Sequence, residues 1–172
     1  MKGITEMAEI LHLTHSFGPL YDPESRVLIL GSFPSVKSRE AGFFYGHPQN
    51  RFWKVIAALT KRELPSSIPE KKALLHESHI ALWDTIASCE ITGASDSSIT
   101  NVTPNDLSPI LETAKIRAVF CNGAASHKLY MKYIFPVTGR EAVKLPSTSP
   151  ANAACSLEKL ISSWSILKDS LV

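Results

Sequence analysis

The sequence predicts an α/β fold of three layers, α/β/α, with a central four-stranded parallel sheet. First, several short apolar runs end in glycine or a polar residue, a pattern typical of buried parallel strands and too short for helices. Second, segments with helical spacing of apolar residues lie between these runs, and strands that alternate with helices form parallel sheets covered on both faces. Third, 172 residues suffice for one hydrophobic core, so we expect a single domain over residues 1–172.

Each predicted element follows from its own local pattern. The four apolar runs that predict strands cover residues 26–31, 79–84, 118–123 and 142–145. Helical spacing predicts helices over residues 50–64, 69–76, 108–114, 124–133 and 153–171. Residues 88–108 are rich in Ser, Thr, Asn, Asp and Gly, so we expect mainly a long surface loop there.

Composition and charge narrow the class of protein. No apolar run approaches the roughly 18 residues of a membrane helix, and the N-terminus lacks the apolar core of a signal peptide. We therefore expect a cytoplasmic protein without a membrane partner. The three cysteines are far apart, which predicts reduced thiols rather than disulfides, structural zinc or an iron–sulfur cluster. A formal net charge of +2 is only mildly basic and does not by itself indicate a nucleic-acid partner.

The segments after the predicted strands carry the residues best suited to a ligand site. Parallel sheets bind ligands at the carboxyl ends of their strands. There the chain has residues 31–35, Asp84, residues 121–123 and residues 146–150. These segments contain no dinucleotide fingerprint, P-loop or serine-hydrolase elbow, and no metal-ligand spacing. We therefore expect a site at this edge that uses neither a cofactor nor a metal ion.

Three motifs, in order along the chain, resemble those of the uracil-DNA glycosylase superfamily. The first is Leu-Gly-Ser-Phe-Pro-Ser at residues 30–35, followed by Tyr-Gly-His-Pro-Gln-Asn-Arg-Phe-Trp at residues 45–53. The second is Phe-Cys-Asn-Gly at residues 120–123. The third, Leu-Pro-Ser-Thr-Ser-Pro-Ala-Asn at residues 145–152, is similar to the late loop that wedges into the duplex. The form of the first motif is most similar to the hypoxanthine-DNA glycosylase branch.

The resemblance implies an enzyme that acts on double-stranded DNA containing a damaged base. It implies a monofunctional DNA glycosylase of base-excision repair that flips out a deaminated base and hydrolyses its N-glycosidic bond. Hypoxanthine is the leading candidate base, and we expect the enzyme to be a monomer. Three alternatives remain open: a mismatch-specific uracil or thymine DNA glycosylase, a non-catalytic nucleic-acid-binding module, and a hydrolase of free nucleosides.

Two residues compete for the catalytic role. Phe33 stands where related enzymes carry a catalytic Asp or Asn, and Leu145 where the strongest uracil enzymes carry His, so another residue must position the water. Asn50 is the first candidate because its amide can both accept from and donate to a water; alternatively, it caps the helix that follows. His47 is the second, as a general base or a donor to the leaving base. His47 equally fits a phosphate contact or a loop position without chemistry.

The expected pocket for the flipped base consists of small, aromatic and acidic residues. They are Gly31, Ser32, Phe33, Phe44, Tyr45 and Asp84. The aromatic rings would stack on the base, with Phe44 preferred. Asp84 would accept from N1–H of hypoxanthine and repel the bare N1 of adenine; alternatively, it caps the following turn. The other histidines, His15 among them, show no partner pattern and are expected to be structural or exposed.

Serine-rich loops are expected to hold the DNA strand. Hydroxyls and loop amides suit phosphate oxygens, and a loop tip can fill the gap that a flipped base leaves in the stack. The residues expected in these roles are Ser35, Lys37, Pro146, Ser147, Thr148, Ser149 and Asn152. Asp96 is expected either to brace the pocket or to form an Asx turn.

Overall fold

A parallel sheet of four strands, in the order β3-β2-β6-β7, forms the centre of the protein. The computed structural model describes residues 9–92 and 98–172, so the predicted role of Asp96 lies outside the described residues. The four strands are β2 (Val27–Gly31), β3 (Ile80–Asp84), β6 (Ala118–Asn122) and β7 (Ala142–Leu145). Each coincides with one of the apolar runs, so the predicted four-stranded parallel sheet is confirmed.

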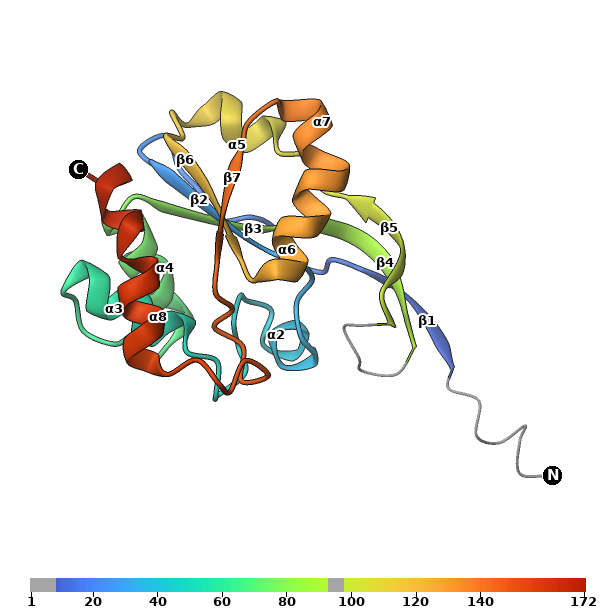
Figure 1. Ribbon diagram of the computed structural model, residues 1–172, viewed down its shortest axis with the longest axis horizontal. Helices are drawn as coiled ribbons and strands as arrows, with labels where there is room; N and C mark the ends of the chain where they lie inside the picture. The colour runs from blue at the N-terminus through green and yellow to red at the C-terminus, as the bar shows by residue number, and fades with distance from the viewer. Residues whose placement is uncertain (1–8, 93–97) are drawn as a thin grey trace.

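Helices cover both faces of this sheet, as Figure 1 shows. On one face lie α3 (Phe52–Thr60), α4 (Ile68–Glu77) and α8 (Leu157–Trp164); on the other lie α6 (Ala124–Leu129) and α7 (Phe135–Thr138), joined by a π-helical turn, Tyr130–Ile134. Two short helices, α2 (Val36–Ala41) and α5 (Ser108–Thr113), lie at opposite ends of the sheet. The predicted three-layer α/β/α fold is confirmed. No helix in the described part of the chain is long and apolar enough to cross a membrane.

The central strand β2 shows why the sheet forms where it does. Val27, Leu28, Ile29 and Leu30 are fully buried, because β2 pairs with β3 on one side and β6 on the other. Burying each of these side chains contributes roughly 1.5–3 kcal/mol. The loop that follows β2 therefore starts from a fully buried strand.

The closing helix is shorter than predicted. α8 begins at Leu157 rather than at residue 153, because the Ser156 side chain caps it by accepting from the Lys159 N–H at 3.2 Å. After α8 the chain tightens into a 3-10 helix, Ser165–Ser170. Residues 146–155 thus form a loop before the cap, which we call the late loop. It lies at the same end of the sheet as α2 (Figure 1).

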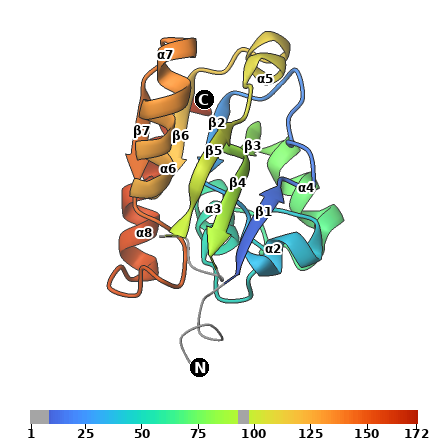
Figure 2. The ribbon, with the colours of Figure 1, turned by 90° about the vertical axis from the view of Figure 1, so that its right-hand side faces the viewer.

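The long loop predicted over residues 88–108 is wrong, since much of this segment pairs in a second sheet. This antiparallel sheet, ordered β1-β4-β5, consists of β1 (Ile10–Thr14), β4 (Ile86–Thr92) and β5 (Thr100–Pro104), and Figure 2 shows it in front of the parallel sheet. Ile86 and Ile91 of β4 are buried in a small core with Phe33. Pairing between distant segments outweighs the turn-forming composition, because it satisfies the backbone groups and buries this apolar face.

Candidate active site

A cavity of about 190 Å³ lies at the carboxyl ends of β2, β3 and β6. It is smaller than the roughly 300–1,000 Å³ of pockets for drug-sized ligands, so it suits one planar base better than a large cofactor. Of the predicted site residues it is lined by Gly31, Ser32, Phe33, Ser35, Phe44, Tyr45, Asn50, Asp84, Ser147, Thr148 and Ser149. It is also lined by Pro34, Ser38, Asn122, Gly123, Ala124, Ala125 and Ser126.

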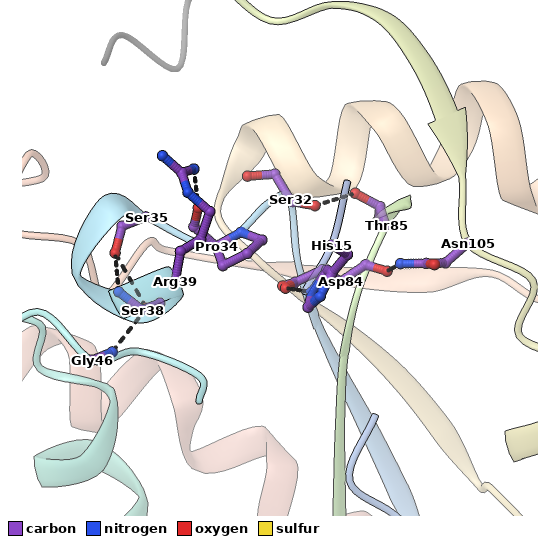
Figure 3. Close-up of polar contacts among 10 residues, drawn as sticks. All are labelled: His15, Ser32, Pro34, Ser35, Ser38, Arg39, Gly46, Asp84, Thr85 and Asn105. Carbon is purple, nitrogen blue, oxygen red and sulfur yellow. Dashed lines mark hydrogen bonds and ion pairs between the residues drawn. The ribbon is translucent and has the colours of Figure 1, made fainter. Parts of the chain in front are cut away.

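Asp84 ends β3 with a buried carboxylate at this cavity. Its side chain is 6% exposed, and Oδ2 lies 2.7 Å from Nε2 of His15. A Cβ atom at Gly31 would lie 2.5 Å from Oδ1, which explains why β2 must end in glycine for the carboxylate to approach. Among the described residues no backbone N–H donates to this carboxylate, so Asp84 is not the turn cap that the sequence left open. Instead, Asn105 donates to the Asp84 carbonyl oxygen at 2.8 Å (Figure 3).

His15 is a neighbour of Asp84 that the sequence analysis missed. It follows β1, and its backbone N–H donates to the Ala87 carbonyl at 2.8 Å, which extends the second sheet toward the pocket. The ring is 3% exposed and lies 4.5 Å from the Trp83 ring and 4.6 Å from the Phe17 ring, centroid to centroid. The sequence carried no signal of the pair because its members lie 69 positions apart.

Asn50 lies at the cavity immediately before Arg51, the N-cap residue of α3. Its Oδ1 accepts from the first helical N–H of α3, that of Phe52, at 2.9 Å, so Asn50 supports the helix start from the position before the N-cap. The same oxygen accepts from Oγ1 of Thr148 at 2.8 Å, and the residue lines the cavity. A backbone N–H can only donate, so this contact fixes which end of the amide is oxygen. Both oxygen lone pairs are therefore used, and the Nδ2 hydrogens are what Asn50 has left to offer a substrate.

Asn122, at the end of β6, holds the late loop against Asn50. Its Nδ2 donates to Oγ1 of Thr148 at 2.9 Å, and its Oδ1 accepts from the Thr148 backbone N–H at 3.0 Å. These bonds direct the Thr148 hydroxyl hydrogen toward Asn50. The next residue, Gly123, has φ +97°, and a Cβ there would lie 3.1 Å from Cβ of Ser147. The Asn-Gly pair thus lets the late loop approach the end of β6 closely.

Arg51 is a second residue whose role the sequence analysis missed. Its guanidinium donates to the backbone carbonyls of Ser149, Asn152 and Cys155. Its backbone N–H donates to the Thr148 carbonyl at 3.0 Å. The late loop is therefore tied to the start of α3 by the residue that follows Asn50.

Of the late-loop residues predicted to contact DNA, some have hydroxyl groups available to a ligand and others brace the loop itself. Oγ of Ser147 accepts from the Ser149 N–H, and Oγ of Ser149 accepts from the Ala151 N–H, each at 3.1 Å. Within residues 9–92 and 98–172 neither hydroxyl donates a hydrogen bond, so both hydrogens can be donated to a ligand. Asn152 donates to the Ser147 carbonyl at 3.0 Å, so its side chain braces the loop. Pro146 and Asn152 lie outside the main cavity but line a neighbouring one together with Ser147 and Ser149.

Tyr45 presents its hydroxyl, not its ring face, to the cavity. The ring stacks on Phe52, with centroids 4.1 Å apart and planes at 19°. Its backbone has φ +52°, an uncommon conformation for a residue with a side chain. The hydroxyl oxygen is buried and has no hydrogen-bond partner among the residues that the structure describes. Burial, and secondarily the Asp84 charge, raise the pKa of Tyr45 far above its usual value against a smaller opposing effect of the nearby Asn122 amide, so the hydroxyl keeps its proton and can donate.

The other predicted aromatic residues belong mainly to the core. Phe44 is 2% exposed, and its ring meets that of Phe17 edge-on at 4.9 Å. Phe33 is 8% exposed and packs in the small core beneath the second sheet. Both residues line the cavity but are almost fully buried, which leaves little ring surface for stacking on a base.

Three other predicted residues either lie away from the cavity or already interact with a neighbouring residue. His47 lies outside the lining, and its Nδ1 accepts from the Gln49 N–H at 3.1 Å. Ser35 lines the cavity but caps α2 by accepting from the Ser38 N–H at 3.2 Å (Figure 3). Lys37 is exposed on α2, with Nζ 3.6 Å from a Glu40 carboxylate oxygen.

Comparison with known proteins places this chain in a family. The sequence model of the uracil DNA glycosylase superfamily matches residues 19–168. The chain belongs to this superfamily. The two residues that differ from the superfamily motifs, Phe33 and Leu145, are both buried apolar side chains, and Leu145 is 3% exposed. The polar side chains that line the pocket include those of Asp84, Asn50 and Tyr45.

Named relatives in the superfamily cover most of the chain. A protein of Methanosarcina acetivorans named hypoxanthine DNA glycosylase is 32% identical over 142 residues, which are 81% of this chain and 89% of that protein. One of Methanosarcina barkeri with the same name is 31% identical over 150 residues, 86% of this chain and 93% of that protein. A solution NMR structure of a candidate uracil DNA glycosylase from Methanosarcina acetivorans has a TM-score of 0.75 and 28% identity, covering 93% of this chain and 99% of that one.

Proposed function

We propose that this protein is a monofunctional DNA glycosylase that flips hypoxanthine out of double-stranded DNA and hydrolyses its N-glycosidic bond. The observation that carries the proposal is the Asp84 carboxylate, buried at the cavity with Oδ1 beside Gly31. A carboxylate offers only acceptors, so the base that binds it must present a donor. Hypoxanthine presents N1–H, whereas adenine presents a bare N1 that the carboxylate repels. Unpaired polar groups of this kind discriminate by several orders of magnitude.

The Tyr45 hydroxyl supplies the complementary donor. It is buried, without a partner in the described residues, and approaches the same place above Gly31 as Asp84, since a Cβ at Gly31 would lie 3.2 Å from it. In hypoxanthine the O6 acceptor is adjacent to N1–H. One acceptor and one donor on the protein therefore match one donor and one acceptor on the base edge.

Asn50 supplies the chemistry next to the sugar. Hydrolysis passes through an oxocarbenium-like sugar and a departing base anion, which fixed donors stabilise. With Oδ1 engaged by Phe52 and Thr148, only the Nδ2 hydrogens of Asn50 remain for the reacting groups. We infer that it donates to the water or to the developing base anion, rather than accepting from the water.

The late loop would contact the DNA backbone and fill the gap left by the base. The free hydroxyl hydrogens of Ser147 and Ser149 suit phosphate oxygens, and Arg51 stiffens the loop from behind. The proposal includes a monomeric enzyme located in the cytosol. Both of these remain predictions.

Uracil is the second candidate base, because its N3–H lies between two carbonyl acceptors. The Asp84 and Tyr45 pair fits that edge as well. The cavity volume of about 190 Å³ accepts a one-ring base as readily as a two-ring one. Single-turnover rates on both bases decide which of them is the main substrate.

The test is single-turnover excision from matched duplexes that contain hypoxanthine, uracil or undamaged adenine at one position. The expected product is an abasic site in an unbroken strand, with hypoxanthine fastest, adenine uncleaved and the rate unchanged by a chelator. Nicking without alkali, or loss of activity with the chelator, would contradict the mechanism. Binding without excision would favour a non-catalytic module, and cleavage of free deoxyinosine at the duplex rate would favour a nucleoside hydrolase.

A further inference from the structure

The His15–Asp84 pair has a feature that packing alone does not explain. Both side chains are almost fully buried, 3% and 6% exposed, and their closest atoms are Nε2 and Oδ2 at 2.7 Å. The other imidazole nitrogen, Nδ1, is also buried and has no hydrogen-bond partner among the described residues. The two polar side chains thus meet through one contact, Nε2 to Oδ2. Nδ1 of His15 and Oδ1 of Asp84 take no part in it.

The surroundings of His15 indicate which nitrogen carries the proton. The ring lies among the rings of Phe17, Phe33, Phe44 and Trp83, with centroids 4.5 to 6.3 Å away. A proton on Nδ1 would be a buried donor without an acceptor, which is unfavourable. A proton on Nε2 meets the Asp84 oxygen. The favoured state is a neutral His15 that donates through Nε2 to an ionised Asp84.

This arrangement controls the other oxygen of the carboxylate. Oδ2 is engaged by His15, so the carboxylate cannot rotate freely, and Oδ1 stays beside Gly31 at the cavity. A carboxyl group in such surroundings without a donor would gain a proton, because an isolated buried charge is unfavourable. A protonated Asp84 can donate as well as accept, and it would no longer reject a bare ring nitrogen.

We propose that His15 is a positioning residue that keeps Asp84 an ionised, oriented acceptor and thereby sets the preference for bases with a ring N–H. This inference rests on the proposed function. His15 acts through Asp84 and does not touch the base. The preference for hypoxanthine over uracil follows from it, because uracil carries a second carbonyl oxygen beside its N3–H. The charged acceptor repels that oxygen, whereas hypoxanthine carries only C2–H in the same place.

Two substitutions at His15 separate donor loss from packing loss. His15→Phe keeps an aromatic ring but removes the donor, whereas His15→Gln keeps a donor. The hypoxanthine-to-uracil ratio of single-turnover rates should fall roughly tenfold in His15→Phe, the scale of changing a charge-assisted hydrogen bond to a neutral one. His15→Gln should keep the ratio within about threefold of wild type. The matched control is Phe17→Leu, which alters packing around the ring but leaves the pair intact and should not move the ratio.

A double substitution tests whether His15 acts through Asp84. In the Asp84→Asn background, His15→Phe should change the ratio no further, because the charge that it controls is gone. The proposal would be overturned if His15→Phe left the ratio at the wild-type value. It would also be overturned if the ratio in the double variant fell by the product of the two single effects.

Infrared difference spectroscopy tests the pair even if the protein excises no hypoxanthine. A protonated-carboxyl stretch should be present in His15→Phe and absent both in the wild type and in His15→Phe/Asp84→Asn. Its absence from His15→Phe would overturn the proposal. Wild-type failure to excise any base, with this band appearing as expected, would count against the proposed function alone.

Discussion

On one side of the pocket, three neutral side chains hold one another, whereas on the other a carboxylate and an imidazole are buried among aromatic rings. The first, which we call the amide side, consists of Asn50, Asn122 and Thr148, linked by hydrogen bonds of 2.8 to 3.0 Å. The second, the acid side, consists of His15, Gly31 and Asp84. The amide side holds the late loop beside the cavity, while the residues of the acid side lie at the ends of β1, β2 and β3.

This difference indicates a division of labour between rate and selectivity. Neutral donors stabilise charge that develops in any N-glycosidic cleavage, so the amide side should act on every base alike. A buried carboxylate strongly favours one pattern of donors and acceptors, because the site has little water to screen it. The acid side should therefore determine which base is excised.

The largest expected effect comes from removing the Asn50 amide. In Asn50→Ala, single-turnover excision should fall at least about a hundredfold for hypoxanthine and uracil equally, the usual scale for losing one positioned donor. DNA binding, measured by fluorescence anisotropy, should survive. A rate within a few-fold of wild type would leave Asn50 with a role at the helix start only and make His47 the leading catalytic candidate.

Asn50→Asp distinguishes a donor from an acceptor at this position. Aspartate can still accept from Phe52 and Thr148, so the support of the helix start is retained, but its second oxygen cannot donate. We expect a loss as large as in Asn50→Ala, with thermal stability close to wild type. Activity equal to or above wild type would show that the residue accepts from the water instead.

A smaller effect is expected from Thr148, which orients the Asn50 amide. Thr148→Val keeps the shape but removes the hydroxyl that donates to Oδ1, so the amide can turn. Excision of both bases should fall roughly tenfold, the worth of one hydrogen bond of about 1 to 1.5 kcal/mol. Thr148→Ser, which keeps the hydroxyl, is the matched control and should stay near the wild-type rate. Equal losses in both variants would indicate a packing role only.

The smallest effect is expected from Tyr45, where the two sides meet. Tyr45→Phe keeps the stack on Phe52 but removes the donor to O6, so hypoxanthine excision should fall about three- to tenfold. The melting temperature of the protein without DNA should not fall, because the hydroxyl has no hydrogen-bond partner among the residues that the structure describes. Since burial raises the pKa of Tyr45, this loss should be the same from about pH 7 to pH 10. An equal rate in Tyr45→Phe would remove the hydroxyl from base recognition.

The sequence predicted the parallel sheet well because its signals are local. Each strand is a short apolar run whose burial depends on its own residues, as in β2. The strand ends then follow from parallel topology, which is why Gly31, Asp84 and Thr148 were expected at one site. The second sheet was missed because β4 and β5 are rich in Ser and Thr, and their pairing depends on contacts that single-sequence patterns do not carry.

The missed site residues share the same cause. His15 lies 69 positions from Asp84, and Arg51 bonds carbonyls about 100 positions away, so neither contact leaves a spacing pattern. Asn50 shows a different limit. Its sequence context fitted both a helix cap and a catalytic amide, and the structure shows that one oxygen supports the helix start while the residue also lines the pocket.

The most direct test of the division between the two sides is a set of four proteins assayed on two bases. Wild type, Asn50→Ala, Asp84→Asn and the double variant are compared by single-turnover excision of hypoxanthine and uracil from otherwise identical duplexes. We predict that Asn50→Ala lowers both rates and leaves their ratio unchanged, while Asp84→Asn lowers the hypoxanthine-to-uracil ratio roughly tenfold, as a charge-assisted hydrogen bond becomes a neutral one. The account would be contradicted if Asn50→Ala changed the ratio, or if Asp84→Asn lowered both rates in parallel.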